Sequence, residues 1–457
     1  MTSRILTVLT AAVLIASCQP KEEATAPASF TFSVEQDAGF TNLPALQSFV
    51  LATDGDDWLI FGGRTNGFHG FGSSQNFPFK KANYNIFVYN TKDKTLDSIP
   101  TSMLPAALRS QYSSTNMQAR QVGNKLYVCG GYGQNNAGMP DSAWVTYNTI
   151  SRIDVKKMIQ AVRAKDSAKL AASIAYVSDD IVKSTGGELY QMPDGRFYLC
   201  LGHIFQGLYT SDSGATGNPF VQQYLDSVHV FKLKETGNSI AFDGPFSYIS
   251  DGLNDSVTQF HRRDLVVVPG VNKDKSFGIS IFGGVFTYRS DNPFGNPIYI
   301  AANNTQSYTI DSNFNQQDNI YSAPSFVLYD DAMDRVYTTI FGGLGNDSAI
   351  QDNAAFTTLI STICRDNKAL TTNLAYNPNP LPAMVGAEGA FIHEKGTPRY
   401  KGNNLEVIDY RKLKAGEKQL VGYIYGGILS NAPEWGDPSN PTRPSSNVYK
   451  VFITLAK

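Results

Sequence analysis

The chain has 457 residues, with 42% hydrophobic and 17% charged residues and a formal net charge of −2. This balance excludes an intrinsically disordered chain and provides no basic surface, so we expect no nucleic-acid partner. The 39 glycines, 24 tyrosines and 27 phenylalanines are typical of a β-rich protein with many turns.

Residues 1–17 have the features of a signal peptide. Arg4 supplies a positive charge, and the apolar run from Ile5 to Ala16 is too short to span a bilayer. The run leads into Leu14-Ile15-Ala16-Ser17-Cys18, which resembles a bacterial lipobox, the motif in which the cysteine is lipidated. An ordinary signal peptide with a chance cysteine is the alternative.

Residues 18–28 are predicted to form a flexible tether from the lipidated Cys18. The lysine and two glutamates at 21–23 resemble a surface-export signal of some Gram-negative lipoproteins. We therefore expect the membrane to be a partner through the lipid anchor. The expected location is the outer membrane, exposed at the cell surface, with its periplasmic face as the alternative.

The rest of the chain repeats one element, a short apolar strand that ends in a glycine pair. Five copies end in two glycines, and a sixth has leucine in place of the first: 62–63, 130–131, 201–202, 283–284, 342–343 and 426–427. The second glycines are 59 to 84 residues apart, which indicates a repeat architecture. Because glycine tolerates positive φ and close backbone approach, we expect a sharp turn after each strand.

The first repeat resembles the kelch repeat of β-propellers. Strands at 48–51, 58–63, 87–90 and 96–100 are separated by polar turns, which matches the four strands of a kelch blade. One departure is Leu96, where kelch repeats usually carry tryptophan. The resemblance implies an all-β fold over residues 29–457: a six-bladed kelch-like propeller with four-stranded antiparallel blades.

The two chain ends are predicted to close the propeller. Residues 447–455 follow the sixth glycine pair and are expected to form a third strand, with no fourth strand after it. The N-terminal strand at 29–34 would supply the missing strand and so cover two sheet edges.

Two segments depart from the strand pattern. Asp154–Tyr176 has apolar residues at helical spacing, and Asp154 is a suitable N-cap, so we predict a small helical insertion near 154–176. A smaller insertion of the same kind is predicted from Asp352 to Ile363.

The cysteines and histidines give no metal pattern. Cys129 and Cys200 occupy the repeat position held elsewhere by phenylalanine or tyrosine, which predicts buried thiols, with a disulfide between them as the alternative. Cys364 is the one remaining cysteine, so the three cysteines after Cys18 are an odd number. The spacing to the five histidines shows no zinc motif, so we expect no metal and no cofactor.

The loops after the glycine pairs form the candidate binding face. They are long and rich in Gly, Asn and aromatic residues, and the entries to the first strands add charge, most densely at His261-Arg262-Arg263-Asp264. The candidate ligand-binding residues are Phe68, His69, Arg109, His203, Arg262 and Tyr288. The alternatives are loops that only pack on one another and arginines that only tie blades together.

Catalysis is the second hypothesis. Kelch propellers include copper oxidases, but no cysteine lies in a loop where such a site needs it, so this activity is disfavoured. They also include sialic-acid epimerases, for which Glu388, His393 and Arg262 are the candidate catalytic residues. We expect a monomer that binds a glycan or a protein on the loop-rich face, with a carbohydrate-active enzyme as the alternative.

Overall fold

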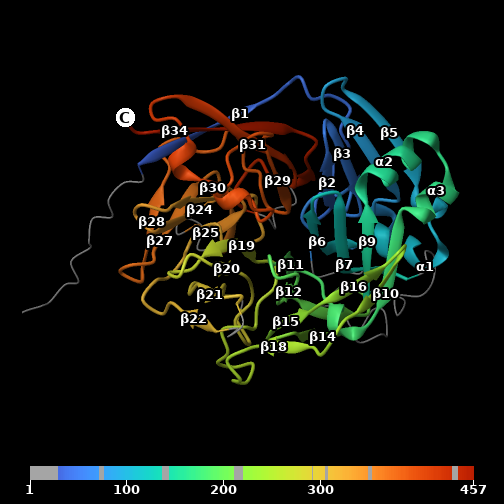
Figure 1. The fold of residues 1–457 in the computed structure, drawn as a ribbon, viewed down its shortest axis with the longest axis horizontal. Helices are drawn as coiled ribbons and strands as arrows, with labels where there is room; N and C mark the ends of the chain where they lie inside the picture. Colours follow the sequence, from blue (N-terminus) through green and yellow to red (C-terminus); the bar gives the residue numbers. More distant parts are fainter. Residues whose placement is uncertain are drawn as a thin grey trace, which may run out of the picture.

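The structure is a computed structural model that describes residues 29–70, 77–135, 144–209, 220–290, 292–303, 307–347, 352–434 and 441–457. Six β-sheets stand around a central axis in chain order (Figure 1). This confirms the predicted six-bladed propeller. The predicted signal peptide and tether, with Cys18, lie outside the described residues. Within the described ranges, no helix is both long and apolar enough to cross a bilayer.

The first three blades contain residues 50–249. Blade one consists of β2 (Val50–Asp54), β3 (Asp57–Phe61), β4 (Asn85–Asn90) and β5 (Thr95–Pro100). Blade two consists of β6 (Thr115–Val122), β7 (Lys125–Gln134), β9 (Thr149–Asp154) and β10 (Ile174–Ser178), with β8 (Trp144–Thr146) beside β7. Blade three consists of β11 (Glu188–Gln191), β12 (Phe197–Cys200), β15 (Val228–Phe231) and β18 (Ser247–Ile249).

The last three blades complete the circle. Blade four consists of β19 (Val266–Val271), β20 (Phe277–Phe282), β21 (Ile298–Ile300) and β22 (Tyr308–Ile310). Blade five consists of β23 (Ser325–Asp330), β24 (Arg335–Phe341), β27 (Ile360–Asp366) and β28 (Thr371–Tyr376), with β30 (Val407–Asp409) parallel to β23. Blade six consists of β29 (Gly389–His393), β31 (Lys418–Gly426), β34 (Val448–Leu455) and β1 (Phe30–Gln36).

Four hairpins and several short helices lie in the connections between the blade strands. The hairpins are β13 (His203–Gln206) with β14 (Val221–Tyr224), β16 (Leu233–Thr236) with β17 (Ser239–Phe242), β25 (Leu344–Asp347) with β26 (Asp352–Phe356), and β32 (Ile428–Leu429) with β33 (Arg443–Pro444). The short helices are α1 (Ala106–Arg109), η1 (Phe79–Lys81), η2 (Thr101–Met103), η3 (Gln111–Ser113), η5 (Asp180–Val182), η6 (Tyr400–Gly402) and η7 (Tyr410–Lys412).

The N-terminal strand closes the propeller, as predicted. β1 pairs antiparallel with β34, from Phe30 opposite Leu455 to Gln36 opposite Tyr449. Phe32 is 1% exposed and packs edge-on against Phe326 and Phe341 of blade five. The strand therefore adds both backbone pairing and a core side chain to the last blade.

The glycine pairs join neighbouring blades. Both positions have positive φ in every copy, including Leu201 at 61° in the degenerate one. The second glycine donates its N–H to a carbonyl at the entry of the next blade, all the way around the propeller. The bonds run from Gly63 to Ser114, Gly131 to Ser184, Gly202 to Arg262, Gly284 to Ile320, Gly343 to Val385 and Gly427 to Leu46, at 2.7–3.3 Å. We call this set the outer ring.

The helical insertion is confirmed at 154–176 and wrong at 352–363. α2 (Val155–Ala164) and α3 (Ser167–Ala172) lie on the outside of the molecule (Figure 1), and the Asp154 carboxylate caps α2 by accepting from the Lys157 N–H. By contrast, 352–363 contains β26 and the start of β27. The β27 segment has neighbours on both sides in blade five, so strand pairing overrides its weak helical pattern.

Cys129 and Cys200 are free and buried, as the repeat position predicted, and Cys364 is also a free thiol. Burial raises the pKa of both Cys129 and Cys200 far above the ordinary range of a thiol. These side chains therefore act as small apolar groups in the sheets.

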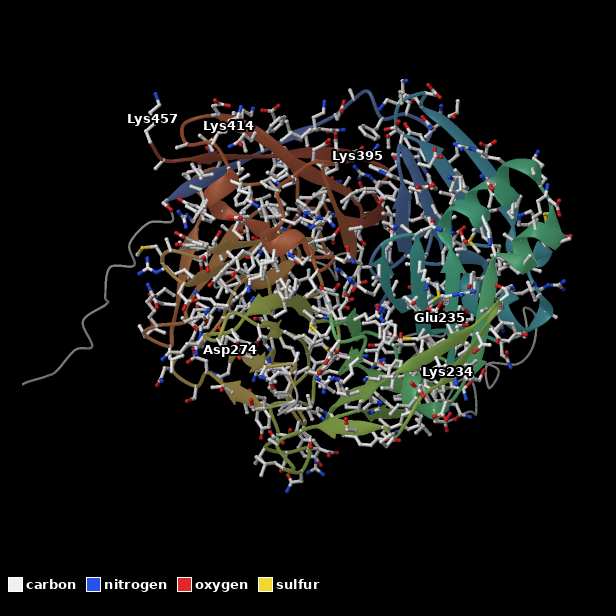
Figure 2. The ribbon with its side chains drawn as sticks, in the orientation of Figure 1. Lys234, Glu235, Asp274, Lys395, Lys414 and Lys457 are labelled. Carbon is white, nitrogen blue, oxygen red and sulfur yellow. The ribbon has the colours of Figure 1, made fainter. Side chains whose placement is uncertain are left out.

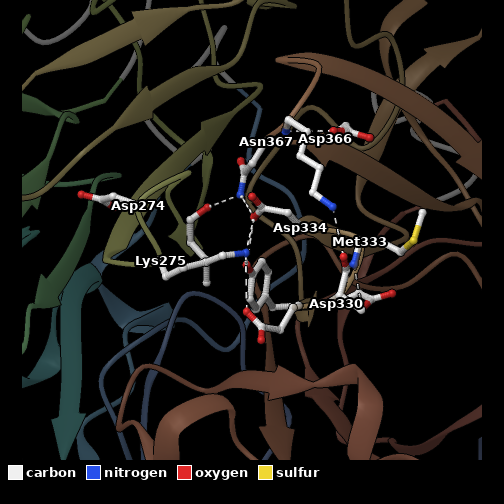
Figure 3. Close-up of polar contacts among 12 residues, drawn as sticks. Asp274, Lys275, Asp330, Met333, Asp334, Asp366 and Asn367 are labelled. Carbon is white, nitrogen blue, oxygen red and sulfur yellow. Dashed lines mark hydrogen bonds and ion pairs between the residues drawn. The ribbon is translucent and has the colours of Figure 1, made fainter.

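Polar contacts between turns also hold blades together at the end of the axis away from the glycine pairs. The Asp334 carboxylate accepts hydrogen bonds from Asn367 (2.9 Å) and Tyr329 (2.9 Å) and pairs with Lys275 of blade four (3.0 Å), as Figure 3 shows. Asn367 also donates to the Val271 carbonyl of blade four at 2.9 Å. Burial alone would raise the pKa of Asp334, but these partners hold it below its ordinary value.

Charged side chains stand mainly on the periphery. Figure 2 labels Lys414 and Lys457 near the C-terminal end, and Lys234 with Glu235 on the hairpin of β16 and β17. Glu235 pairs with Lys125 (2.7 Å) and Arg152 (3.0 Å), which lowers its pKa to about 2 in spite of the opposing effect of partial burial. This cluster fastens the hairpin to blade two.

A pair of glycine substitutions tests the outer ring. Gly342 (φ 65°) faces the Val385 carbonyl so closely that a Cβ would collide with it, whereas Gly396 (φ 80°) has open space around it. Both Gly→Ala changes impose the same left-handed strain, of about 1–2 kcal/mol. In urea unfolding, we expect Gly342→Ala to lower the free energy of unfolding by at least about 2 kcal/mol more than Gly396→Ala does. The added Cβ forces the Val385 carbonyl of the next blade's entry away from Gly342. Equal losses would contradict the role given to the glycine pair.

Candidate functional site

A second closed set of hydrogen bonds surrounds the axis itself. Six residues, one at the entry of each blade, form it. Each donates its backbone N–H to the carbonyl of the equivalent residue in the preceding blade. They are Ser48, Asn116, Gly186, Asp264, Ser322 and Glu388, with Ser48 donating to Glu388, at distances of 2.7–3.5 Å. We call this set the inner ring. All of them except Ser322 have positive φ, between 50° and 68°.

The inner ring brings polar side chains together on the axis. The Asn116 Nδ2 lies 3.4 Å from Asp264 Oδ1 and 3.4 Å from Glu388 Oε2. The Ser48 hydroxyl donates to Glu388 Oε2 at 2.7 Å. These residues line a cavity of about 100 Å³, together with Ser322 and Glu188. This is enough room for a small polar group or several waters.

The carboxyl groups in this cavity are held away from bulk water. Burial, with the nearby Asp264 charge, raises the pKa of Glu388 to about 8, although the Ser48 hydrogen bond opposes the shift. Burial likewise raises the pKa of Asp264 and brings that of Glu188 to about 7. Glu388 Oε1 is buried with no hydrogen-bond partner among the described residues. A carboxyl group in this setting favours its neutral, protonated form.

Arg263 supplies the positive charge beside these acids. Its Nε lies 3.6 Å from Asp264 Oδ2, and its Nη2 donates to the Tyr209 hydroxyl at 3.0 Å. Its Nη1 lies 3.2 Å from His203 Nδ1. A guanidinium can only donate, so Nδ1 must accept, and His203 is neutral with its proton on Nε2. Burial and the charge of Arg263 hold the pKa of His203 well below its ordinary value.

Aromatic side chains form a wall above the carboxyl groups. His69 stacks on Phe68, with ring centroids 5.3 Å apart, and meets the Tyr209 ring edge-on at 4.8 Å. Burial and the nearby Asp264 charge raise the pKa of Tyr321, and the Tyr321 ring lies 6.4 Å from that of Phe68. Burial lowers the pKa of His69 to about 4, so this ring is also neutral.

We call this arrangement the axial funnel. Its floor consists of Ser48, Asn116, Asp264, Ser322 and Glu388, and its rim of Phe68, His69, His203, Tyr209, Arg263 and Tyr321. Donors, acceptors and aromatic faces occur together within it. Such a surface can hold a polar ligand by hydrogen bonds and stacking, and it carries acidic groups able to exchange a proton near neutral pH.

The far end of the axis is covered by a segment of blade six. β30 pairs with the axis-facing edge of β23, and Leu405 and Val407 are buried in the core. Arg120 of blade two donates to the Asn404 carbonyl, and Lys401 donates to the Lys275 carbonyl of blade four at 3.0 Å. This covering segment, residues 398–409, therefore contacts several blades at the end opposite the funnel.

The structure places three of the predicted ligand-binding residues on the funnel rim and three elsewhere. Phe68, His69 and His203 lie together on the rim. Arg109 is on α1, donates to the Leu104 carbonyl and lines a separate cavity of about 190 Å³. Tyr288 is 40% exposed, with its ring 6.4 Å from that of His261.

Arg262 is a structural residue in the described fold. It is fully buried and donates to the carbonyls of Gln259 (2.6 Å), Gly283 (3.0 Å) and Asn296 (2.8 Å). Its guanidinium also lies over the Phe294 ring at 4.5 Å. These contacts attach the entry loop of blade four to the residues that follow β20 and precede β21 in the same blade.

The three predicted catalytic residues do not converge. Glu388 is on the funnel floor, whereas His393 is five residues further along β29, about 16 Å away at about 3.3 Å per residue. His393 packs on Phe326 and reaches Glu406 of the covering segment at 3.7 Å. Glu388 therefore meets Asp264 and Asn116 in place of His393 and Arg262.

Sequence reasoning missed Ser48, Asn116 and Asp264 as neighbours of Glu388, and Arg263 as the partner of Asp264. A usable signal exists in blades one to three, where the inner-ring residue precedes the second glycine by 15 or 16 positions. In blades four to six this spacing is longer and varies, so it no longer identifies the inner-ring residue.

Comparison with known proteins gives similarity of fold alone. No family model and no curated protein sequence matches the chain. Among solved structures, one titled "Structure of YjhT" is similar with a TM-score of 0.47 and 11% identity, covering 91% of this chain and 100% of that chain. The structure itself is a six-bladed propeller of four-stranded blades, and its glycine pairs resemble those of kelch repeats.

The raised pKa of Glu388 predicts a pH-dependent gain from Glu388→Gln. Glutamine keeps an acceptor for Ser48 and stays neutral at every pH. In the wild type, Glu388 ionises above about pH 4.5 in the unfolded chain but only above about pH 8 in the folded protein, so the wild type loses stability as the pH rises between these values. At pH 8.5 we expect the free energy of unfolding of the variant to exceed that of the wild type by at least about 1.4 kcal/mol, which corresponds to one pKa unit. Near pH 4 the two free energies should be equal.

Urea unfolding at both pH values makes this measurement. Glu417→Gln changes an exposed glutamate outside the funnel and should show no such pH-dependent difference. If the free energy of unfolding of Glu388→Gln differs from that of the wild type by the same amount at both pH values, the Glu388 carboxyl group is not protonated in the folded protein as we infer.

Proposed function

We propose that the axial funnel binds the terminal unit of a glycan. The observation that carries this proposal is the meeting of Asp264, Glu388 and Asn116 beneath Arg263 and an aromatic rim. Sugars present hydroxyl groups that both donate and accept, and apolar ring faces that stack on aromatic side chains. The floor and rim of the funnel offer the complementary groups.

A protein ligand is supported less well by the same geometry. Stable protein interfaces bury roughly 800 Å² on each partner over broad surfaces, whereas the floor cavity is about 100 Å³ and polar. One polar group of a sugar is small enough for that cavity, whereas a flat protein surface would cover the rim and leave the carboxyl groups without partners.

Acid–base chemistry on the bound sugar is the second candidate. It is favoured by the two carboxyl groups with raised pKa values that share the Asn116 amide. Arg263 beside Asp264 favours loss of the proton there first, which leaves Glu388 as the protonated acid near pH 7. The pair then has one proton acceptor and one proton donor, as an isomerisation or hydrolysis needs.

The test is a calorimetric screen of mono- and oligosaccharides against the purified protein, with NMR to detect turnover. We expect a glycan hit that Arg263→Lys and Glu388→Gln each weaken at least tenfold, because both remove a directed polar contact. Glu417→Gln is the control and should bind as the wild type does. A hit unaffected by either funnel variant would contradict the site. Turnover that Asp264→Asn abolishes would establish the second candidate.

We further propose that the protein is a lipid-anchored outer-membrane protein that faces outward, with the membrane as a partner through its anchor. Support comes from the lipobox-like sequence at Cys18 and the lysine–glutamate segment after it. Replacement of Cys18 by serine removes the thiol that would carry the lipid. We expect Cys18→Ser to shift the protein from the membrane to the soluble fraction, whereas Cys364→Ser should leave it membrane-bound.

A further inference from the structure

A cluster of metal-ligand side chains lies beside the funnel. One ligand atom each from Asp226, Asp255 and His261 lies within 4.8 Å of the other two. Asp226 precedes β15, and Asp255 belongs to the loop that leads from β18 into the entry of blade four. Two carboxylates and one imidazole are donors that divalent first-row metals use in proteins.

The separation of two of these ligand atoms suits coordination of a single ion. His261 Nδ1 and Asp226 Oδ1 are 2.9 Å apart. Two ligands that each lie about 2.1 Å from one ion, at a right angle, are separated by about 3 Å. The third ligand, from the exposed Asp255, approaches from the solvent side.

His261 is held in place independently of the carboxylates. Its side chain is 11% exposed, and its ring stacks on Tyr224 with centroids 3.8 Å apart. The neighbouring Arg262 is fixed by its hydrogen bonds to Gln259, Gly283 and Asn296. A buried imidazole whose ring plane is fixed and whose nitrogen edge meets two carboxylates is pre-organised for a metal.

We propose that Asp226, Asp255 and His261 bind one divalent transition-metal ion, of the Zn²⁺ or Mn²⁺ class. Three protein ligands leave positions for water or for an oxygen atom of a ligand. Tyr224 connects the site to the funnel, because it stacks on His261 and meets the His203 ring at 5.7 Å. The ion would therefore fix β14 and, through it, the paired strand β13 that carries His203 of the rim, whether or not the funnel binds a glycan.

Calorimetry on the chelator-treated full-length protein tests this site, with Zn²⁺, Mn²⁺, Ca²⁺ and Mg²⁺ titrated separately. We expect one Zn²⁺ or Mn²⁺ per chain, bound at least tenfold more weakly by Asp255→Asn and by His261→Gln. The matched control is Asp243→Asn, an exposed aspartate in the same blade, which should bind as the wild type does.

Spectroscopy supplies a second readout. Co²⁺ added to the metal-free protein should give visible absorption bands that are lost in His261→Gln, provided that circular dichroism shows the variant folded. The proposal is overturned if neither Zn²⁺ nor Mn²⁺ binds at one per chain. It is also overturned if Asp255→Asn binds as tightly as Asp243→Asn, or if Ca²⁺ or Mg²⁺ binds more tightly than both transition metals.

Discussion

Two closed rings of backbone hydrogen bonds hold the six blades around one axis. In the outer ring, the second glycine of each pair donates to the next blade's entry, and in the inner ring each entry residue donates to the blade before it. A closed ring cannot lose one member without exposing the partners on both sides. The pairing of β1 with β34 matters for the same reason, because it completes the blade that joins the last ring members to the first.

The inner ring also determines the chemistry of the funnel. Positive φ is a conformation that glycine, asparagine and aspartate accept most readily, yet Ser48 and Glu388 adopt it too. Backbone strain of this kind persists where the surroundings over-determine it, and it is often found at functional sites. It places Asp264 and Glu388 next to the same Asn116 amide, away from bulk water. The backbone arrangement that closes the propeller is thus also the cause of the raised pKa values on its floor.

The sequence predicts those parts of the molecule whose signals are local. The glycine pairs identify the second strand of each blade, and Asp154 with its apolar spacing identifies α2, because strand ends and helix caps depend on adjacent residues. The partners of Glu388 come from entries up to 340 positions away in the chain, such as Ser48, so no local pattern reveals them. Arg262 and Arg263 are adjacent and chemically alike. Only packing shows that the first is buried among carbonyls while the second meets the funnel.

The covering segment closes one end of the axis. With Leu405 and Val407 buried and Arg120 bound to the Asn404 carbonyl, the far end is occupied by protein. His393 and Glu406 belong to that end. Burial and the charges of Arg399 and Arg120 hold the pKa of His393 below its ordinary value, although the Glu406 charge opposes the shift. Under the proposed function, a ligand enters past the loops that follow the glycine pairs. The two rings repeat from blade to blade, whereas these loops all differ, so the proposal assigns specificity to the part of the chain that the repeat leaves unconstrained.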